Sequence, residues 1–588
     1  MRIVIVGGVA GGMSAAARAR RLDETAEIVV LEKGEYVSFA NCGLPYHLGG
    51  EIERRQSLLL HTPNTLRRSL NLDVRTNSEA IAIDRASRTV TVAGPDGEYS
   101  LTYDALILAP GAKPLVPPIT GVEHSSVFQL YTMPHLDRIM EHVDMLLASP
   151  GSESTDMPVA EQLPHAVVVG AGFIGLESVE ALVHRGLRVT VVEFAPHVLP
   201  PIDDELAPII QRELEANGVD VKVSTAVKTI TPAGNGAAGR REGSVVVGLS
   251  DGTSLDADLV LLSTGVAPNS GLAKDAGLEL GVRDAIVVDS MMRTSDRHIW
   301  AVGDAVQLRQ DVGGVEVLGP VPLAAPANRH GRLAADAIIR GLTSDDPRPP
   351  LVLATSIVRV FGQVAAVTGA SRRALARSGV DSVTVHVHPN QHAGYYPGTQ
   401  QIHLVGSFSQ DGRLLGAQAV GPEGVDKRID VLATALKGGL SADDLADLDL
   451  TYAPPFGSAK DAVNMLGFTA QNILDGTMPV WYAEDLDEAR RSGLILDVRS
   501  VAEFGSGHLP EALNVPHNRL RGRLDEVRAA AGDRPVFVHC LSGVRSYLAV
   551  RILRGHGIDA RNLSGGALTL ENVVGGWTER PVLTSQRV

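Results

Sequence analysis

One cysteine near the amino terminus has the setting of a redox centre. Cys42 lies in the stretch SFANCGLPY, residues 38–46, and the other cysteine of the chain, Cys540, lies near the far end. With no neighbouring thiol, Cys42 is expected to react alone, through a mixed disulfide, a persulfide or a sulfenic acid. The thiolate is the nucleophile, so this role needs a low pKa, and residues 43–45 resemble the first turn of a helix, whose positive end favours a thiolate. The alternative is a buried structural cysteine.

Cys540 follows a predicted buried strand, residues 536–539, and begins a loop that leads into a helix. A loop of this kind at a helix N-terminus is a cradle for a thiolate and its substrate. The loop consists of Cys540, Leu541, Ser542, Gly543, Val544 and Arg545. We therefore expect a second reactive cysteine in a separate α/β module.

A glycine-rich turn follows the first apolar run, residues 2–6. The turn contains Gly7, Gly8, Val9, Ala10, Gly11 and Gly12, and an alanine-rich helix is predicted over 14–22. The next strand, 28–31, ends at Glu32, 20 residues after Gly12. In such a unit the glycines let the backbone approach a pyrophosphate, the helix end binds it, and the acid accepts ribose hydroxyls. Val9 stands at the middle glycine position, which makes this motif weak by itself.

A second and complete dinucleotide motif follows the apolar run 167–169. Its turn is supplied by Gly170, Gly172 and Gly175, and the next strand, 189–192, ends at Glu193. Glu193 can accept both ribose hydroxyls of NADH and would repel the 2′-phosphate of NADPH. Residues 194–197 contain no arginine that would bind this phosphate. NADH is therefore favoured over NADPH.

Two further apolar runs, 105–112 and 299–305, continue the first dinucleotide fold after interruptions. The second run contains Asp304, which is placed to hydrogen-bond a ribitol chain. One dinucleotide fold inserted in another implies two bound dinucleotides. Polar or small residues over 150–163 and 231–243 predict a linker and an exposed loop. A long helix is predicted over 327–340.

Composition limits the classes of function. A chain of 588 residues is expected to form about four domains. Its formal net charge of −15 argues against nucleic acid or anionic membrane as a general partner. Two distant cysteines favour a reducing compartment over a disulfide framework. A first strand at Arg2 leaves no room for a signal peptide, and no apolar run reaches the roughly 20 residues of a membrane span, so we expect a cytoplasmic protein without a membrane partner. We predict no metal site.

Four sequence features together resemble one family. They are the stretch 38–46, the loop HAGYYPG at 392–398, the loop YAPPFGSAKD at 452–461 and the Cys540 loop. Their combination closely resembles the coenzyme A-disulfide reductase–rhodanese fusions, two-dinucleotide-fold pyridine nucleotide-disulfide oxidoreductases that include NADH-dependent persulfide and polysulfide reductases. The six-residue Cys540 loop resembles that of rhodaneses, whereas related phosphatases have a loop one residue longer. Leu541 stands where many rhodaneses have Arg or Lys, which casts doubt on thiosulfate as the sulfur donor.

The resemblance implies an α/β architecture with two nested Rossmann-like dinucleotide-binding domains, an α+β dimerisation domain and a C-terminal rhodanese-like α/β domain. The expected ranges are 1–150 with 255–328 for the FAD-binding domain, 151–254 for the NAD-binding domain, 329–470 for the dimerisation domain and 480–588 for the rhodanese-like domain. A turn-rich boundary at 476–479 precedes the last domain.

The resemblance also implies site residues. FAD and NADH would be bound by Gly7, Gly8, Val9, Ala10, Gly11, Gly12, Glu32, Lys33, Ser38, Asn41, Ala80, Ala109, Pro110, Gly111, Gly170, Gly172, Phe173, Ile174, Gly175, Glu193, Gly265, Gly303, Asp304, Leu323, Ala324, Tyr452 and Phe456. Coenzyme A would be contacted by Ser14, Arg18, Arg21, Ser38, Asn41 and Lys460. Cys42 would be the nucleophile beside the flavin. Tyr452 would reach the flavin site of the other subunit of a homodimer, and Tyr395 or Tyr396 would join it as proton donor, a choice that the sequence leaves open.

Three functions compete. The first is an FAD-dependent reductase of CoA persulfide, CoA disulfide or polysulfide, in which Cys540 carries sulfane sulfur. The second is an NADH peroxidase or oxidase with Cys42 cycling through sulfenic acid. The third is a sulfur-carrier or redox-sensing flavoprotein. The rhodanese-like loop and the context of Cys42 favour the first.

Overall fold

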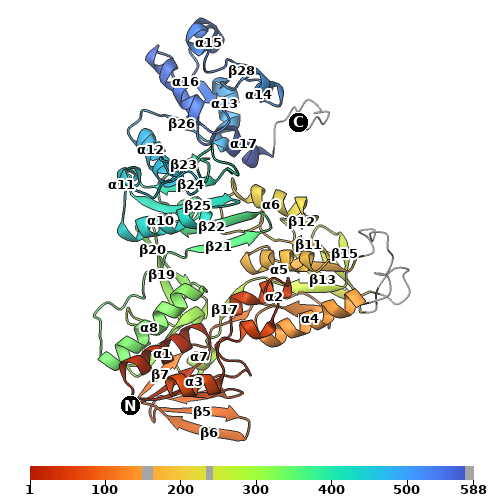
Figure 1. Ribbon diagram of the computed structural model, residues 1–588, viewed down its shortest axis with the longest axis vertical. Coiled ribbons are helices and arrows are strands. Elements are labelled where there is room, and N and C mark those ends of the chain that lie inside the picture. The colour runs from red at the N-terminus through yellow and green to blue at the C-terminus, as the bar shows by residue number, and fades with distance from the viewer. Residues whose placement is uncertain (149–162, 234–240, 242, 576–588) are drawn as a thin grey trace. The chain divides into compact units, whose positions relative to one another are not determined.

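The computed structural model describes residues 1–148, 163–233, 241 and 243–575 (Figure 1). The chain folds into two compact units. One contains Met1–Pro196, Glu215–Asp311 and Glu316–Ala354, and the other contains His197–Leu214, Val312–Val315 and Thr355–Val588. The predicted linker at 150–163 lies outside the described residues except for its last residue, as does most of the predicted loop at 231–243.

The first unit contains two parallel five-stranded sheets, which differ in that one edge strand, β18 or β9, comes last in the first sheet and first in the second along the chain. The first sheet has the order β18-β7-β1-β2-β3, and its strands are β1 (Arg2–Val6), β2 (Glu27–Leu31), β3 (Asp73–Arg75), β7 (Ala105–Leu108) and β18 (Ile299–Ala301). The second has the order β12-β11-β10-β16-β9, with β9 (Val127–Gln129), β10 (His165–Val169), β11 (Arg188–Val192), β12 (Asp220–Lys222) and β16 (Leu259–Leu262). Both orders are those of doubly wound nucleotide-binding folds. Strands β9 and β16 lie outside the range 151–254 that we expected for the second fold.

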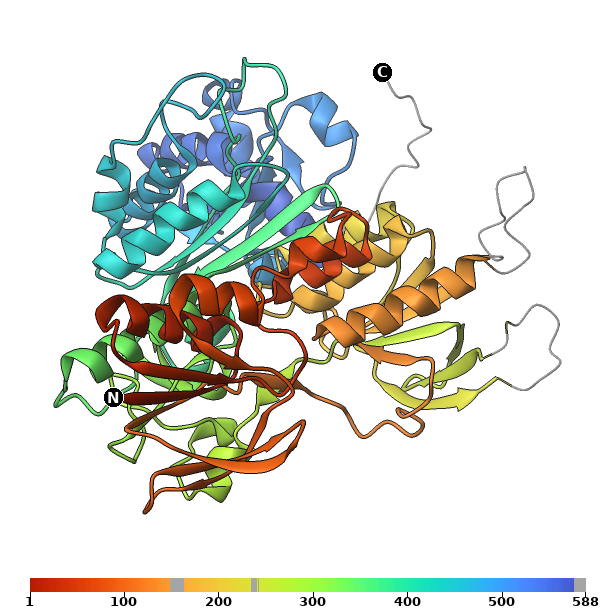
Figure 2. The same ribbon diagram turned by 60° about the horizontal axis from the view of Figure 1, so that its bottom comes forward.

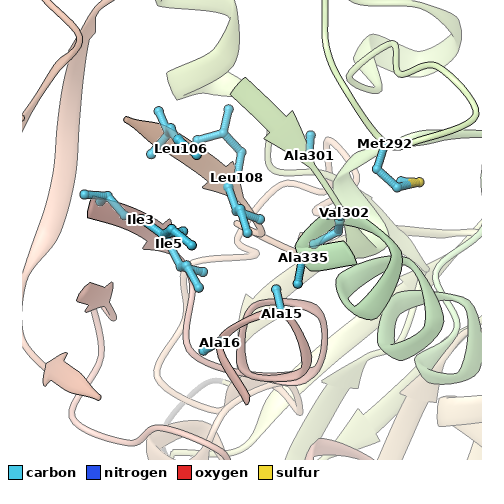
Figure 3. Close-up of a cluster of buried hydrophobic side chains, with 14 of the residues drawn as sticks. Ile3, Ile5, Ala15, Ala16, Leu106, Leu108, Met292, Ala301, Val302 and Ala335 are labelled. Carbon is cyan, nitrogen blue, oxygen red and sulfur yellow. The ribbon is translucent and has the colours of Figure 1, made fainter. Parts of the chain in front are cut away.

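Two helices pack against the first sheet and against each other, α1 (Ala10–Leu22) and α8 (Ala324–Arg340) (Figure 1). Their small side chains allow this close contact, because a Cβ added to Gly331 would lie 2.2 Å from the carbonyl oxygen of Gly11. Both helices begin before the predicted positions 14 and 327. Figure 3 shows the resulting core, in which the side chains lie between β1, β7 and the two helices: Ile3, Ile5, Ala15, Ala16, Leu106, Leu108 and Ala335.

The remaining elements of this unit surround the two sheets. The helices are α2 (Leu44–Leu48), α3 (Pro63–Leu70), α4 (Met133–Ala148), α5 (Phe173–His184) and α7 (Gly271–Asp275). Two antiparallel three-stranded sheets are formed by β4 (Glu79–Asp84), β5 (Thr89–Gly94) and β6 (Gly97–Thr102), and by β13 (Val227–Pro232), β14 (Val245–Leu249) and β15 (Ser254–Ala257). Two-stranded ribbons are formed by β8 (Ala112–Pro114) with β17 (Val266–Pro268) and by β19 (Gln307–Val312) with β20 (Val315–Pro320).

The second unit begins with an antiparallel sheet of order β21-β22-β25-β24-β23. Its strands are β21 (Ser356–Val360), β22 (Gln363–Gly369), β23 (Val383–Val387), β24 (His403–Phe408) and β25 (Leu414–Gly421). Helix α10 (Val425–Gly438) lies along one face (Figure 2), and α12 (Ala462–Leu474) contributes to the same hydrophobic core. The unit also contains α6 (Ala207–Ala216), α9 (Arg372–Arg377) and α11 (Ala442–Asp447).

The C-terminal part of the second unit is a parallel sheet of order β26-β30-β29-β27-β28. Its strands are β26 (Val480–Trp481), β27 (Leu494–Asp497), β28 (Leu513–Asn514), β29 (Val536–His539) and β30 (Ala560–Leu563). They are connected by α13 (Leu486–Ser492), α14 (Val501–Gly505), α15 (Leu524–Ala531) and α16 (Val544–Gly555), and α17 (Gly566–Val574) follows β30. The predicted α/β architecture is confirmed.

Candidate active sites

Cys42 lies in a single 3₁₀ turn, Asn41–Gly43, directly before α2. Its side chain is exposed. The turn is held by the side-chain amide of Asn41, which donates a hydrogen bond to the carbonyl of Tyr131 at 3.1 Å. Ser38 precedes it with φ near 50°, a left-handed conformation that serine seldom adopts. The backbone therefore presents the thiol at the start of a helix, as predicted.

The protein groups around Cys42 do not produce the low pKa that we predicted. Burial by surrounding atoms, Glu177 and Asp304 together raise the pKa of the thiol. The helix that follows has only five residues, so few peptide dipoles add up at its N-terminus. Two acidic side chains and partial desolvation therefore outweigh the helix end.

Contacts between α2 and α5 hold the Cys42 segment against the second dinucleotide fold. The Tyr46 hydroxyl donates a hydrogen bond to Glu177 at 2.9 Å. A Cβ added to Gly49 would lie 3.0 Å from the Cα atom of Ala181, so the two helices approach closely here. Asp304, the predicted partner of the ribitol chain, is part of a 3₁₀ turn after β18, and burial raises its pKa to about 6.

The first glycine-rich turn fits a dinucleotide. Gly7 has φ of 103°, and a Cβ there would lie 2.0 Å from the carbonyl oxygen of Ala109, so only glycine is accommodated. The Glu32 carboxylate lies at the turn and accepts hydrogen bonds from the amides of Gly8 at 2.8 Å and Gly34 at 2.9 Å. These contacts orient the acid beside the N-terminus of α1, where a ribose and a pyrophosphate bind in such folds. Val9 occupies the N-cap of α1.

The second glycine-rich turn has the same construction. Glu193 is buried and accepts hydrogen bonds from the amides of Ala171 and Ala195, both at 2.7 Å. A Cβ added to Gly172, the N-cap of α5, would meet no atom within 4 Å, so there is open space at the helix N-terminus. Gly175 packs against the carbonyl of Gly170. The open helix end and the oriented acid fit a second dinucleotide.

The other predicted cofactor residues gather mostly at the carboxyl ends of the parallel strands, where ligands bind in such folds. Ala109, Pro110 and Gly111 follow β7, Gly303 follows β18, and Gly265 follows β16. Leu323 and Ala324 begin α8, and Phe173 and Ile174 begin α5. Ala80 lies in β4, and Lys33 is exposed with its amine 3.7 Å from Glu79.

The predicted coenzyme A residues differ in their surroundings. Arg18 is engaged in a two-point ion pair with Asp336, with nitrogen–oxygen distances of 2.7 and 3.1 Å. Ser14 donates a hydrogen bond to Asn328 at 2.5 Å. Arg21 and Lys460 are exposed. Arg21 is thus the more accessible of the two arginines. The difference arises because Arg18 binds Asp336, which lies 318 positions further along the chain.

The structure distinguishes between the two candidate tyrosines. The hydroxyl groups of Tyr395 and Tyr452 are 3.0 Å apart, although the residues lie in different loops. This hydrogen bond raises the pKa of Tyr395. Tyr396 instead has its ring edge-on to His392, with 5.5 Å between ring centroids. Tyr395, Tyr452 and the neighbouring Phe456 are 76%, 48% and 71% exposed, so this loop region presents aromatic groups to its surroundings.

The Cys540 loop is built as a cradle. The Cys540 thiol is buried and accepts a hydrogen bond from the Ser546 hydroxyl, with 3.3 Å between oxygen and sulfur. The first turn of α17 binds the loop backbone, because the amides of Ala567 and Leu568 donate to the carbonyls of Cys540 and Leu541 at 2.8 and 3.0 Å. Gly566 is needed for this approach, since a Cβ there would lie 2.7 Å from the Cys540 carbonyl oxygen.

Sequence reasoning missed two side chains at the Cys540 loop. Ser546 follows the loop by one position and contacts the sulfur. Glu503 of α14 binds both terminal nitrogens of Arg545, at 2.8 and 2.6 Å. The only signal in the sequence is that Ser500 and Glu503 form a capping box, which predicts a helix start and not an ion pair.

Comparison with known proteins identifies the class. The model for the pyridine nucleotide-disulphide oxidoreductases matches residues 1–331, that for their dimerisation domain matches 356–463, and that for the rhodanese-like domain matches 478–569. The chain therefore belongs to the pyridine nucleotide-disulphide oxidoreductase family, with a rhodanese-like domain at its C-terminal end. Proteins of this family use FAD and NAD(P)H, and both dinucleotide sites described above fit that use.

Three similar proteins narrow the comparison. A coenzyme A disulfide reductase of Staphylococcus haemolyticus is 32% identical over 80% of this chain and 100% of its own length. A solved structure of reduced CoADR-RHD from Bacillus anthracis is 40% identical, with a TM-score of 0.89 over 98% of both chains. The structure of an NAD-dependent persulfide reductase from A. fulgidus is 36% identical, with a TM-score of 0.86 over 97% of this chain and 100% of that one. Across the described part of the chain, no helix is both long and apolar enough to cross a membrane.

Proposed function

We propose that this protein is an FAD-dependent reductase that uses NADH in preference to NADPH to reduce coenzyme A persulfide, coenzyme A disulfide or polysulfide. The observation that carries the proposal is Cys42, an exposed thiol in the same unit as two dinucleotide folds, with no second cysteine to resolve it. A small mixed disulfide or persulfide is the chemistry that such a thiol supports. The similar proteins named for coenzyme A disulfide and persulfide agree with this assignment.

The chemistry at Cys42 begins with attack of its sulfur on a disulfide or persulfide. With coenzyme A disulfide, one S–S bond breaks, a Cys42–coenzyme A mixed disulfide forms, and one coenzyme A thiolate leaves. When bound, FAD and NADH supply the two electrons that restore the Cys42 thiolate and release the second coenzyme A. The acids Glu177 and Asp304 disfavour the thiolate form of Cys42. The thiolate is therefore most stable when a bound ligand offsets the negative charges of these two acids.

A proton donor for the leaving thiolate is supplied by the tyrosine pair. Tyr395 remains protonated at neutral pH because its hydrogen bond to Tyr452 raises its pKa further above neutrality. We propose that the active unit is a homodimer in which this pair serves the other subunit's Cys42. The exposed aromatic side chains of Tyr395, Tyr452 and Phe456 support this arrangement, as does the matching dimerisation domain.

The domain assignment follows the same logic. We propose an FAD-binding domain at 1–150 with 255–328, apart from β9 and β16, which complete the sheet of an NAD-binding domain at 151–254. We further propose a dimerisation domain at 329–470 and a sulfur-transferring domain at 480–588. In the last of these, Cys540 would carry sulfane sulfur as a persulfide.

Replacement of Cys42 tests the proposal directly. Cys42→Ser should retain bound FAD and its reduction by NADH, but turnover with coenzyme A disulfide or persulfide should fall to the background rate. Cys540→Ser is the matched control, because it removes the other thiol. Wild-type turnover of hydrogen peroxide or oxygen exceeding that of the sulfur substrates would instead favour an NADH peroxidase or oxidase.

A further inference from the structure

The Cys540 loop contains one basic side chain, and that side chain is already neutralised. Arg545 is the single Lys or Arg among residues 540–545. Both of its terminal nitrogens are bound by the Glu503 carboxylate, whose side chain is 32% exposed beside the 29% exposed arginine. Glu503 is itself held by the backbone amide and hydroxyl of Ser500, at 3.0 and 2.7 Å. The Glu503 carboxylate is therefore held by Ser500 while it binds Arg545.

Two titratable side chains at the ends of the neighbouring strands β27 and β29 add no net positive charge. Arg499, after β27, makes a buried ion pair with Asp497, with 2.7 Å between nitrogen and oxygen. His539, next to Cys540, is fully buried, and burial lowers its pKa, so it is neutral at pH 7. Three exposed side chains of the loop and of the start of α16 are apolar, since Leu541, Val544 and Leu548 are 41%, 59% and 53% exposed. The exposed arginines of α16, Arg551 and Arg554, lie further along the helix and bind the carbonyl of Thr477 and the carboxylate of Asp559.

We propose that Glu503 makes the Cys540 site select hydropersulfides, RSSH, over thiosulfate as sulfur donors. This inference rests on the proposed sulfur-transfer function of the domain and specifies its substrate class. The sequence indicated only that Leu541 removes a charge from the loop. The ion pair adds that a carboxylate already binds both terminal nitrogens of the remaining arginine and offsets its charge. The pKa of Arg545 is raised first by Glu503 and also by Cys540, so this offset acts close to the sulfur.

The two transfers differ in the charge that the loop must accept. With a hydropersulfide, the Cys540 thiolate attacks the terminal sulfur, the S–S bond breaks, and Cys540–SSH and RS⁻ form with a total charge of one throughout. With thiosulfate, the same attack yields Cys540–SS⁻ and sulfite, and the reacting atoms carry three negative charges. Neither step needs an external oxidant or reductant. A trianionic transition state requires a nearby cation, and Glu503 has neutralised Arg545.

Glu503→Gln is the decisive variant. Glutamine preserves the capping-box geometry with Ser500 and removes the charge that neutralises Arg545. We expect the ratio of kcat/KM for thiosulfate to kcat/KM for glutathione persulfide to rise about tenfold, because one unpaired cation interacts more strongly with the trianionic transition state than with the monoanionic one. The assay is sulfur transfer to cyanide by the full-length, flavin-loaded protein. Glu503→Asp, which keeps the charge, should return the ratio toward the wild-type value.

Two further variants keep the test decisive. Leu541→Lys adds a cation without disturbing the ion pair and should raise the ratio of kcat/KM for thiosulfate to that for glutathione persulfide. This variant provides a result if Glu503→Gln does not fold. Glu511→Gln breaks a comparable ion pair, with Arg490 at 2.5 Å, and is the matched control in the same domain. An unchanged ratio in a folded Glu503→Gln protein, or an equal rise in Glu511→Gln, would overturn the proposal.

Cys540→Ser separates this inference from the proposed function. Loss of transfer from both donors in this variant would show that Cys540 is the sulfur carrier, so that an unchanged ratio in the Glu503 variants would refute the selectivity alone. Retained transfer would refute the sulfur-transfer role, and the selectivity with it.

Discussion

At the scale of single residues, the two cysteines are held in opposite ways. Cys42 is exposed and near two acids that raise its pKa, whereas Cys540 is buried and accepts a hydrogen bond from Ser546. Negative neighbours oppose the charged form of a thiol. The charge on Cys42 therefore depends on what binds beside it.

The tyrosine pair leads to a prediction at the same scale. Tyr395→Phe and Tyr452→Phe should each reduce kcat for coenzyme A disulfide by roughly 10² or more, the usual contribution of a positioned general acid. Reduction of the flavin by NADH, measured in a stopped-flow experiment, should be unchanged. Tyr396→Phe is the matched control, since its ring contacts His392 and not Tyr452. An equal loss in Tyr396→Phe would contradict the assignment.

At the scale of elements, the second βαβ unit determines the choice of nicotinamide. Glu193 is oriented at the end of β11 by two backbone amides. The wild type should prefer NADH by kcat/KM, and Glu193→Gln should shift the NADPH/NADH ratio about tenfold toward NADPH by removing one charge repulsion. Steady-state kinetics with both coenzymes measure the ratio. A wild type that uses NADPH equally well would show that another group binds the 2′-phosphate.

The contact between the antiparallel sheet and the C-terminal module contains one buried histidine, His386, and two half-buried ones, His388 and His403. His386 bonds to Ser564 at 2.8 Å and to Glu205 at 3.0 Å. His388 bonds to Thr569 at 3.0 Å, and its Nδ1 lies 2.9 Å from that of His403. The adjacent glycines of α17 touch the Cys540 loop. This polar contact therefore joins the sulfur-transferring module to the sheet that we propose forms the dimer.

These histidines predict a pH dependence of stability. Burial and the positive charge of Arg212 lower the pKa of His403 to about 4, and burial first, then His403, lower that of His388 well below its usual value. The unfolded chain binds more protons than the folded chain below about pH 6.5, so stability is complete above that value and falls as the pH approaches 4. Each group contributes at most about 1.4 kcal/mol per pH unit.

Chemical denaturation between pH 7 and pH 4 measures this dependence. His403→Gln should reduce the slope with which the free energy of unfolding of the second unit depends on pH. His330 of α8, whose pKa burial lowers to about 4, belongs to the first unit, and His330→Gln is the control that should affect the first unit instead. A slope unaffected by His403→Gln would contradict the prediction.

At the scale of the whole molecule, the proposed dimer can be tested by mixing two defective subunits. A Cys42→Ser subunit lacks the nucleophile, and a Tyr452→Phe subunit lacks the hydroxyl. If Tyr452 acts in the other subunit, the mixed dimer contains one intact site, with Cys42 from one chain and Tyr452 from the other. Coexpressed, doubly tagged mixed dimers should regain about half the wild-type kcat, one working site in two. Activity no higher than that of the two parent dimers would indicate action within one subunit.

Both dinucleotide folds, the C-terminal module and the position of each cysteine before a helix could be predicted from the sequence. These features depend on residues close together along the chain, in which glycine spacing, an apolar strand and a following helix are one local pattern. The sequence pattern predicts helix starts at 14 and 327, later than the observed starts at Ala10 and Ala324, because Gly11, Gly12 and Pro326 weaken a helical pattern. Close helix packing tolerates the two glycines, and the first turn of a helix tolerates Pro326.

Contacts between residues far apart in the sequence determined how the functional side chains are paired. The pairing of Tyr395 with Tyr452, of Arg18 with Asp336 and of Arg545 with Glu503 joins residues 57, 318 and 42 positions apart. The raised pKa of Cys42 likewise arises first from burial and then from Glu177 and Asp304, and only the folded chain brings these groups near the thiol. Sequence patterns determine which side chains are present and which element carries each one. Electrostatic interactions depend on distance, and the packing of distant elements sets these distances. The tertiary structure therefore decided the pairing and the electrostatic surroundings of the functional groups.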